Sequence, residues 1–240
     1  MLGKLDEELC CTNARLARTM LFSDQRIADF INATFEPVWE SVRDVPIISI
    51  DFRNGHVINR TIPGNIATYV LAADGQVLDI LPGMYTPDAY LAQLKWFKTL
   101  DYIASMPFER RQAALYEYHT DAIKRLSLKS TPHSISLTAA GMGAGGGAAT
   151  ATERSTKPIA STKPDLPEVA PGVQKLTMDE ASQWQALVQD TRDNEVHRRS
   201  TIHESLAKSK PVRPDAVTKW LFREVLNLDL DDPYLGLSPR

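Results

Sequence analysis

Two pairs of apolar segments, each divided by a short turn signal, constrain the fold of this chain more than any other feature. Residues 46–61 hold Asn54-Gly55 between isoleucine- and valine-rich runs, and residues 68–81 hold Asp74-Gly75 between similar runs. Asn-Gly and Asp-Gly are the strongest two-residue hairpin signals, because both turn positions then need a positive φ. The sequence therefore predicts two β-hairpins close together along the chain.

The segment before these hairpins is predicted to be mainly helical. Residues 5–33 carry apolar side chains at helical spacing, as one helix or as two segments with Ser23 capping the second. Residues 35–42 follow as a candidate strand. Pro37 has no backbone N–H to donate to a neighbouring strand, so this strand is expected either to lie at a sheet edge or to begin near the proline.

Two further helices are predicted after the second hairpin. Thr86, Pro87 and Asp88 match the N-cap, the first position and the acidic first turn of a helix. Its apolar stripe continues to about residue 103. A second helical pattern covers residues 108–126.

The composition changes after this point and predicts three regions. Residues 128–175 are rich in Gly, Ala, Ser, Thr and Pro, which predicts a flexible linker between residues 1–127 and 176–240. The last region is predicted to be a small helical module that begins at a capping box, Thr177 to Glu180. About 65 residues is close to the lower limit for independent stability, so we expect it to dock on residues 1–127 or on a partner.

Composition and charge exclude several functional classes. The chain has 240 residues, of which 43% are hydrophobic, and a formal net charge of −3. This charge indicates neither a nucleic-acid partner nor an anionic membrane, and the sequence has no apolar run long enough for a membrane helix. Acidic residues stand near the N-terminus, where a signal peptide would need an apolar core, and there are only two cysteines. We therefore expect a cytoplasmic protein without a disulfide framework.

The order of helix, strand, hairpin and helix in residues 10–100 resembles the thioredoxin-like superfamily. The match consists of Cys11-Thr-Asn-Ala14 at a helix start, the strand 35–42, the segment 66–70, the Asp74-Gly75 turn and Gly83 before the last helix. The resemblance implies an α/β thioredoxin-like domain, with a first strand that is abbreviated or absent, followed by a small all-α C-terminal module.

The chain departs from the family pattern at three points. Ala14 stands where the second Cys of C-x-x-C belongs, and Ala67 stands where the family has its cis-proline. The nine residues before Cys10 are polar and predict a helix rather than the strand that the family has there. These departures remove the resolving thiol and the proline that flanks the family's active site.

The resemblance implies thiol chemistry at the cysteine pair. A Cys in the first turn of a helix has its thiolate favoured by free N–H groups and the helix dipole. Cys11 is therefore the candidate nucleophile. Cys10 is the candidate resolver, which could act only through a strained vicinal disulfide. The candidate client groove consists of Asn65, Ile66, Ala67 and Thr68. The function would be thiol-disulfide or peroxide-linked, with a protein thiol or disulfide as the client and no cofactor.

The alternative belongs to another functional class. If the cysteines are inert, the same scaffold is a non-catalytic adaptor, with a protein partner at the thioredoxin-like surface and a second one at the C-terminal module. Aromatic residues dominate such contacts, so the candidate partner-binding residues are Trp184, Trp220, Tyr234 and Leu235. These side chains would otherwise form the core of the module itself.

Other chemical patterns carry no site prediction. The two adjacent cysteines lack zinc spacing, and the five histidines are scattered, so no metal site is predicted. Residues 227–232 fit a solvated acidic turn better than a calcium loop. Acids interleave the basic residues between 192 and 213, which predicts a solvated helix face. These basic residues are Arg192, Arg198, Arg199, Lys208, Lys210 and Arg213.

Overall fold

The computed structural model describes residues 10–61, 64–130 and 180–234. The predicted N-terminal helix is confirmed over its described part as two segments. The first is α1 (Thr12–Leu16), which continues into the π-helix η1 (Ala17–Leu21), and the second is α2 (Gln25–Thr34). Asp24 caps α2 rather than Ser23, because its carboxylate accepts a hydrogen bond from the Arg26 N–H at 2.9 Å.

The predicted strand at residues 35–42 is wrong. Residues 35–42 form no strand, and Arg43, the next residue, makes a single β-bridge. The segment offers little apolar surface to a sheet, since Val38 is 85% exposed and Trp39 is 49% exposed, and Pro37 lacks a ladder donor. Arg43 instead holds the C-terminal segment, because its Nη1 donates to the carbonyls of Leu230 at 2.9 Å and Asp232 at 2.6 Å.

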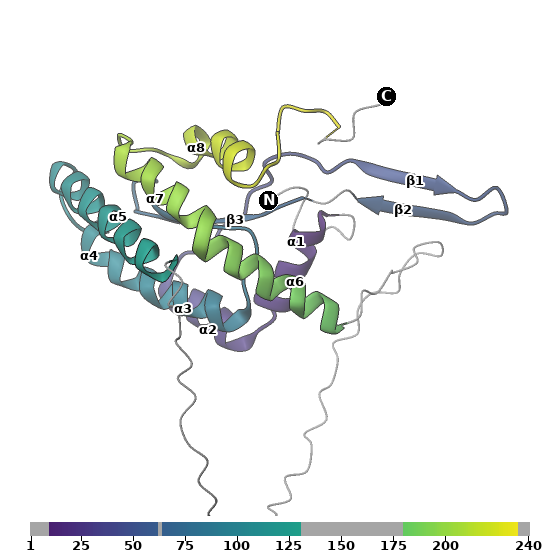
Figure 1. The fold of residues 1–240 in the computed structure, drawn as a ribbon, viewed down its shortest axis with the longest axis horizontal. Coiled ribbons are helices and arrows are strands. Elements are labelled where there is room, and N and C mark those ends of the chain that lie inside the picture. The colour runs from purple at the N-terminus through teal and green to yellow at the C-terminus, as the bar shows by residue number, and fades with distance from the viewer. Residues whose placement is uncertain (1–9, 62–63, 131–179, 235–240) are drawn as a thin grey trace, which may run out of the picture.

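The first predicted hairpin is confirmed. Strands β1 (Ile47–Asp51) and β2 (Val57–Thr61) pair antiparallel, with Ile50 opposite Ile58. We call residues 47–61 the arm, because it extends away from the helices as an isolated two-stranded ribbon (Figure 1). Its turn differs from the predicted one, since Arg53 and Gly55 have the positive φ values and Asn54 does not.

The second predicted hairpin is also confirmed. Strands β3 (Ala67–Leu71) and β4 (Val77–Pro82) pair antiparallel, with an irregularity between Val70 and Leu71. Only Gly75 has a positive φ in the turn, and its N–H donates to the Ala72 carbonyl at 2.9 Å. The Asp-Gly pair therefore serves a three-residue loop with a bulge at the glycine, not a two-residue turn.

The helices after β4 occur where they were predicted. Pro87 is the first residue of α3 (Pro87–Phe97), which leads through the 3₁₀ turn η2 (Lys98–Leu100) into the short α4 (Asp101–Ala104). The long α5 (Phe108–Ser130) extends past the predicted end at residue 126. The linker predicted at 128–175 lies outside the described residues from 131 onward.

The C-terminal helices pack against the β3–β4 hairpin and α5. Helix α6 (Glu180–Asp193), the π-helix η3 (Asn194–Arg198) and α7 (Arg199–Lys208) form one continuous helical segment. Helix α8 (Pro214–Trp220) and the π-helix η4 (Leu221–Val225) follow. The capping box that was predicted before α6 lies largely outside the described residues.

Specific polar contacts fix this docking. The Asn194 amide donates to the Met84 carbonyl at 2.6 Å, and the Val77 N–H at the start of β4 donates to the Val212 carbonyl at 2.9 Å. Buried residues of both chain halves form one hydrophobic cluster that includes Leu21, Ile80 and Phe222. The C-terminal segment therefore docks on the preceding residues, while the three-region division of the chain stays a prediction.

The described part of the chain is a mixed α/β structure with two antiparallel two-stranded sheets. A thioredoxin-like arrangement is not confirmed. None of the described helices is long and apolar enough to cross a membrane.

Candidate functional site

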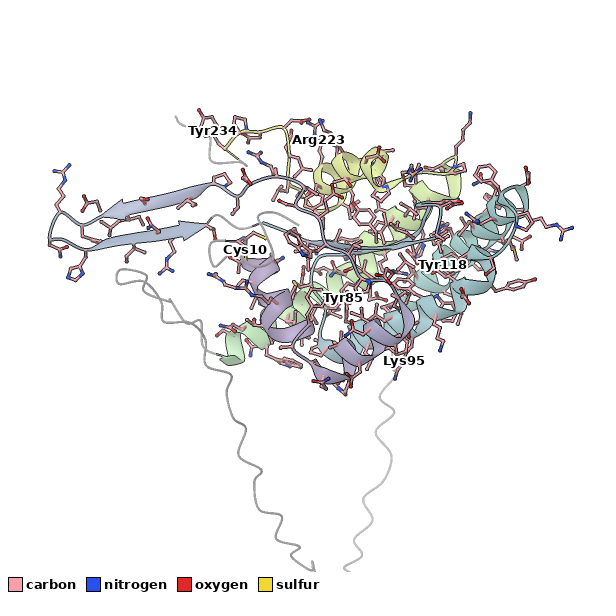
Figure 2. The ribbon with its side chains drawn as sticks, turned by 180° about the vertical axis from the view of Figure 1, so that it is seen from behind. Cys10, Tyr85, Lys95, Tyr118, Arg223 and Tyr234 are labelled. Atoms are coloured by element: carbon pink, nitrogen blue, oxygen red, sulfur yellow. The ribbon has the colours of Figure 1, made fainter. Side chains whose placement is uncertain are left out.

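The two cysteines lie at the start of α1, near the base of the arm (Figure 2). Both side chains are completely buried. The Cys11 Sγ accepts a hydrogen bond from the Ala14 N–H at 3.4 Å, so the thiol acts as the N-cap of α1. Thr61, at the end of β2, donates from its hydroxyl to the Cys10 carbonyl at 3.0 Å. The pair therefore connects the helix to the arm.

The predicted client groove lies next to this helix start. Asn13, two residues after Cys11, donates from its amide to the Asn65 side chain at 2.9 Å. Ile66 is buried, and the Thr68 hydroxyl lies 3.0 Å from the Tyr90 hydroxyl. The structure thus brings the cysteine helix and the start of the predicted groove together, but packing and hydrogen bonds already occupy these side chains.

The predicted partner-binding residues do not form one surface. Trp184 on α6 is 47% exposed, and Tyr234 in the C-terminal segment is 49% exposed. Trp220 packs against the hydrophobic core, which fits the alternative that it belongs to the core. Leu235 lies outside the described residues.

The arm has the most conspicuous uncovered surface among the described residues. Side chains alternate between the two faces of a ribbon, so Ile48 and Ile50 share a face with Ile58 across the strand pair, and Phe52 continues the alternation. We call these four residues the apolar face of the arm. Arg60, opposite Ile48, is the charged residue of the strand pair on this face. Ile48, Ile50 and Phe52 are 40%, 45% and 53% exposed.

The opposite face of the arm is more polar. Ser49 donates from its hydroxyl to the Asn59 amide oxygen at 2.7 Å, and Asp51 lies farther along the strand. Ile47 and Val57 are the apolar residues on this face. The ribbon is therefore amphipathic. Sheets of this pattern usually cover their apolar face, and a lone two-stranded hairpin is marginally stable in water.

A second feature is a buried polar cluster between β4, α5 and α7. Asp79 of β4 has no exposed surface, and Arg199 of α7 donates to its Oδ2 at 3.1 Å. The Tyr118 hydroxyl of α5 donates to the same oxygen at 2.5 Å. Tyr118 is labelled in Figure 2, away from Cys10 and among the helices. The cluster is thus separate from the cysteine pair.

Two histidines complete this cluster. The His119 Nδ1 of α5 lies 2.9 Å from the His203 Nδ1 of α7, and the His203 Nε2 lies 3.1 Å from the Arg199 Nη2. Both rings are about 1% exposed, and the Tyr118 ring makes edge contacts with both. A chain of hydrogen bonds therefore connects α5 to β4 through α7.

Burial and the neighbouring charges set the protonation of this cluster. Burial lowers the pKa of His119 to about 4 and that of His203 to about 3. Burial has the largest single effect on Asp79 and would raise its pKa, but the Arg199 guanidinium and the other polar groups of the cluster together outweigh burial and lower this pKa below its ordinary value. At neutral pH the cluster thus contains an ionised Asp–Arg pair and two neutral imidazoles.

Sequence patterns did not reveal this cluster. The prediction that the basic residues between 192 and 213 form a solvated face is wrong for Arg199, which is 4% exposed because it pairs with Asp79. A signal was present in the run 77–82, where a single aspartate stands inside an apolar strand. A buried carboxylate needs a partner, but the identity of that partner depends on contacts across more than a hundred residues.

Comparisons with family models, curated proteins and solved structures found no match to this chain. Membership of the thioredoxin-like superfamily therefore stays a prediction. Within the described residues, no group of three or more His, Cys, Asp or Glu side chains is arranged to hold a metal ion.

Proposed function

We propose that this protein is a non-catalytic interaction protein whose arm docks on the arm of a second copy of the same chain. The uncovered apolar face of the arm carries this proposal. Burying an aliphatic or aromatic side chain is worth about 1.5–3 kcal/mol, and Ile48, Ile50 and Phe52 keep 40–53% of their surface exposed. The proposal develops the adaptor alternative and does not depend on a thioredoxin-like fold.

Three observations favour a second copy as the occupant of this face. A two-fold axis needs only one self-complementary patch, and two such apolar faces would form a small sandwich core at the usual sheet spacing of about 10 Å. The arm extends clear of the helices in both views, so two antiparallel arms leave room for the two bodies (Figures 1 and 2). The net charge of −3 adds little repulsion between copies.

The small size of the arm predicts a weak, reversible dimer. A stable interface usually buries about 800 Å² per partner, and a ribbon with two five-residue strands offers less than this. We therefore expect association with a dissociation constant between about 1 μM and 1 mM.

Sedimentation velocity over a range of protein concentrations tests this function. The wild type should shift from monomer to dimer, and Ile50→Lys should remain a monomer because it places a charge in the centre of the apolar face. Asn59→Lys is the matched control, since it adds the same charge on the opposite face, and it should dimerise like the wild type. A wild type that stays monomeric throughout, or an Ile50→Lys variant that dimerises normally, would overturn the proposal.

A thiol function at Cys11 is the second candidate. The observation that favours it is the hydrogen bond from the Ala14 N–H to the Cys11 Sγ, because N–H donors stabilise a thiolate. Burial of the thiol works against it. Titration of the thiols in the folded protein with a thiol reagent tests this candidate. Fast modification that is lost in Cys11→Ser would support redox chemistry at Cys11. Modification that occurs only after unfolding would contradict it.

A further inference from the structure

The hydrogen-bond chain between α5 and α7 has only one arrangement of protons when both histidines are neutral. Arginine has donors and no acceptor, so the His203 Nε2 must accept from Arg199 at 3.1 Å. The proton of His203 therefore lies on Nδ1 and is donated to the His119 Nδ1 at 2.9 Å. The proton of His119 then lies on Nε2.

This arrangement leaves no free acceptor nitrogen on either ring. An added proton must go to the His119 Nδ1 or the His203 Nε2, and each of these already accepts a hydrogen bond. If His203 first moves its own proton to Nε2, that proton faces the Arg199 guanidinium. The uptake of one proton therefore breaks a bond that joins α7 either to α5 or to its own Arg199.

The surrounding charges do not compensate a second cation. Asp79 lowers the cost of charging these rings, but it already accepts hydrogen bonds from Arg199 and Tyr118. Arg199 and Arg125 repel a protonated His203. Lys210 and Tyr116 line the shallow groove beside His119, and Glu195 and Tyr85 face Arg199.

We propose that the His119–His203 pair is an acid-sensitive lock, which holds α7 on α5 and β4 while both imidazoles are neutral and releases it when they are protonated. This inference is independent of the arm and of its partner. It concerns the docking of the C-terminal helices, because α7 carries both Arg199 and His203.

The sign of the pH dependence follows from linkage. Both histidines have a folded-state pKa below the ordinary value of 6.5, so the unfolded chain binds more protons as the pH falls below 6.5. The contribution of the two neutral histidines to the free energy of unfolding is complete above pH 6.5 and is lost progressively as the pH falls to about 4. For each unit by which the pH falls in this range, each histidine should raise the unfolding equilibrium constant about tenfold. The pair together should raise it about a hundredfold per unit.

Urea unfolding of the full chain as a function of pH tests the lock. The wild type should show this steep loss of stability, and the double variant His119→Gln/His203→Gln should have a nearly flat profile between about pH 6.5 and 5. Glutamine retains a donor and an acceptor without titrating. His197→Gln is the matched control, since His197 is exposed on the same helical segment, and it should keep the wild-type slope.

Two outcomes would overturn the lock: a wild-type unfolding constant that changes by less than about threefold over this range, or a double variant as steep as the wild type. If the double variant does not fold, calorimetric proton uptake on wild-type unfolding at about pH 5.5 replaces it. Uptake of nearly two protons supports the proposal, and uptake near zero rejects it.

Discussion

The arm and the β3–β4 hairpin are built from similar sequence signals but have opposite environments. Both are antiparallel strand pairs, and each closes through a loop with a glycine at φ above +80°. Every residue of β4 is buried, including Asp79, whereas every residue of β1 is exposed. The C-terminal helices cover the one hairpin and leave the other uncovered.

The comparison shows that turn chemistry specifies a hairpin but not its role. A hairpin that is covered on both faces becomes part of the core. A charged residue on such a hairpin is then buried and must be hydrogen-bonded to its neighbours. The uncovered hairpin has apolar side chains without a packing role in the monomer, which is why we assign it to a docking surface. Matched substitutions in the two hairpins test this distinction.

The largest difference is expected for the two aspartates. Asp79→Ala leaves the Arg199 guanidinium buried and without its carboxylate, which should reduce the free energy of unfolding by about 3–5 kcal/mol. Asp51→Ala in the arm should change it by at most about 0.5 kcal/mol. Urea unfolding at neutral pH measures both, and equal losses would show that burial does not distinguish the hairpins.

The two isoleucines should differ in the same direction by a smaller amount. Ile80→Ala removes a side chain with no exposed surface and should cost about 2–5 kcal/mol, because it leaves a cavity in β4. Ile50→Ala should cost less than about 1 kcal/mol in the monomer, since the side chain is 45% exposed. The comparison must be made at low protein concentration, where the arm has no partner. A costlier Ile50→Ala would mean that the arm is covered in the monomer.

The turn glycines should show the smallest difference. An added Cβ at Gly75 would lie 2.7 Å from the Arg213 Nη2, whereas at Gly55 it meets nothing within 4 Å. Both positions have a positive φ, so each alanine variant should lose about 1–2 kcal/mol of local backbone free energy. For Gly55→Ala that loss should stay in the arm and leave the melting temperature of the body unchanged. Calorimetry of the two variants would contradict this if Gly55→Ala lowers the main transition as much as Gly75→Ala.

Local signals in the sequence were enough for most elements of the fold. The two hairpins, the proline-started helix α3 and α5 follow from turn residues, caps and periodicity, which act over a few neighbouring residues. The predicted strand at 35–42 is wrong because Phe35 and Val42 pack against the core without a neighbouring strand to pair with, while Val38 and Trp39 between them are exposed.

The candidate sites were less accessible, because they depend on contacts between distant residues. His119 and His203 are 84 residues apart, and Asp79 and Arg199 are 120 apart. The position of Cys11 at a helix start was predicted correctly, but its burial depends on packing that periodicity does not describe. The exposure of the arm could not be inferred either, since its isoleucine-rich strands resemble those of a buried sheet.

Hydrogen exchange at two protein concentrations tests the central claim most directly. The amides of β3 and β4 should be protected at any concentration, because the helices cover them. The amides of the arm should exchange rapidly in dilute solution and become protected at high concentration, as two apolar faces come together. An arm that is equally protected in dilute solution, or that stays unprotected where β4 is protected at high concentration, would contradict its role as a docking surface for a second copy.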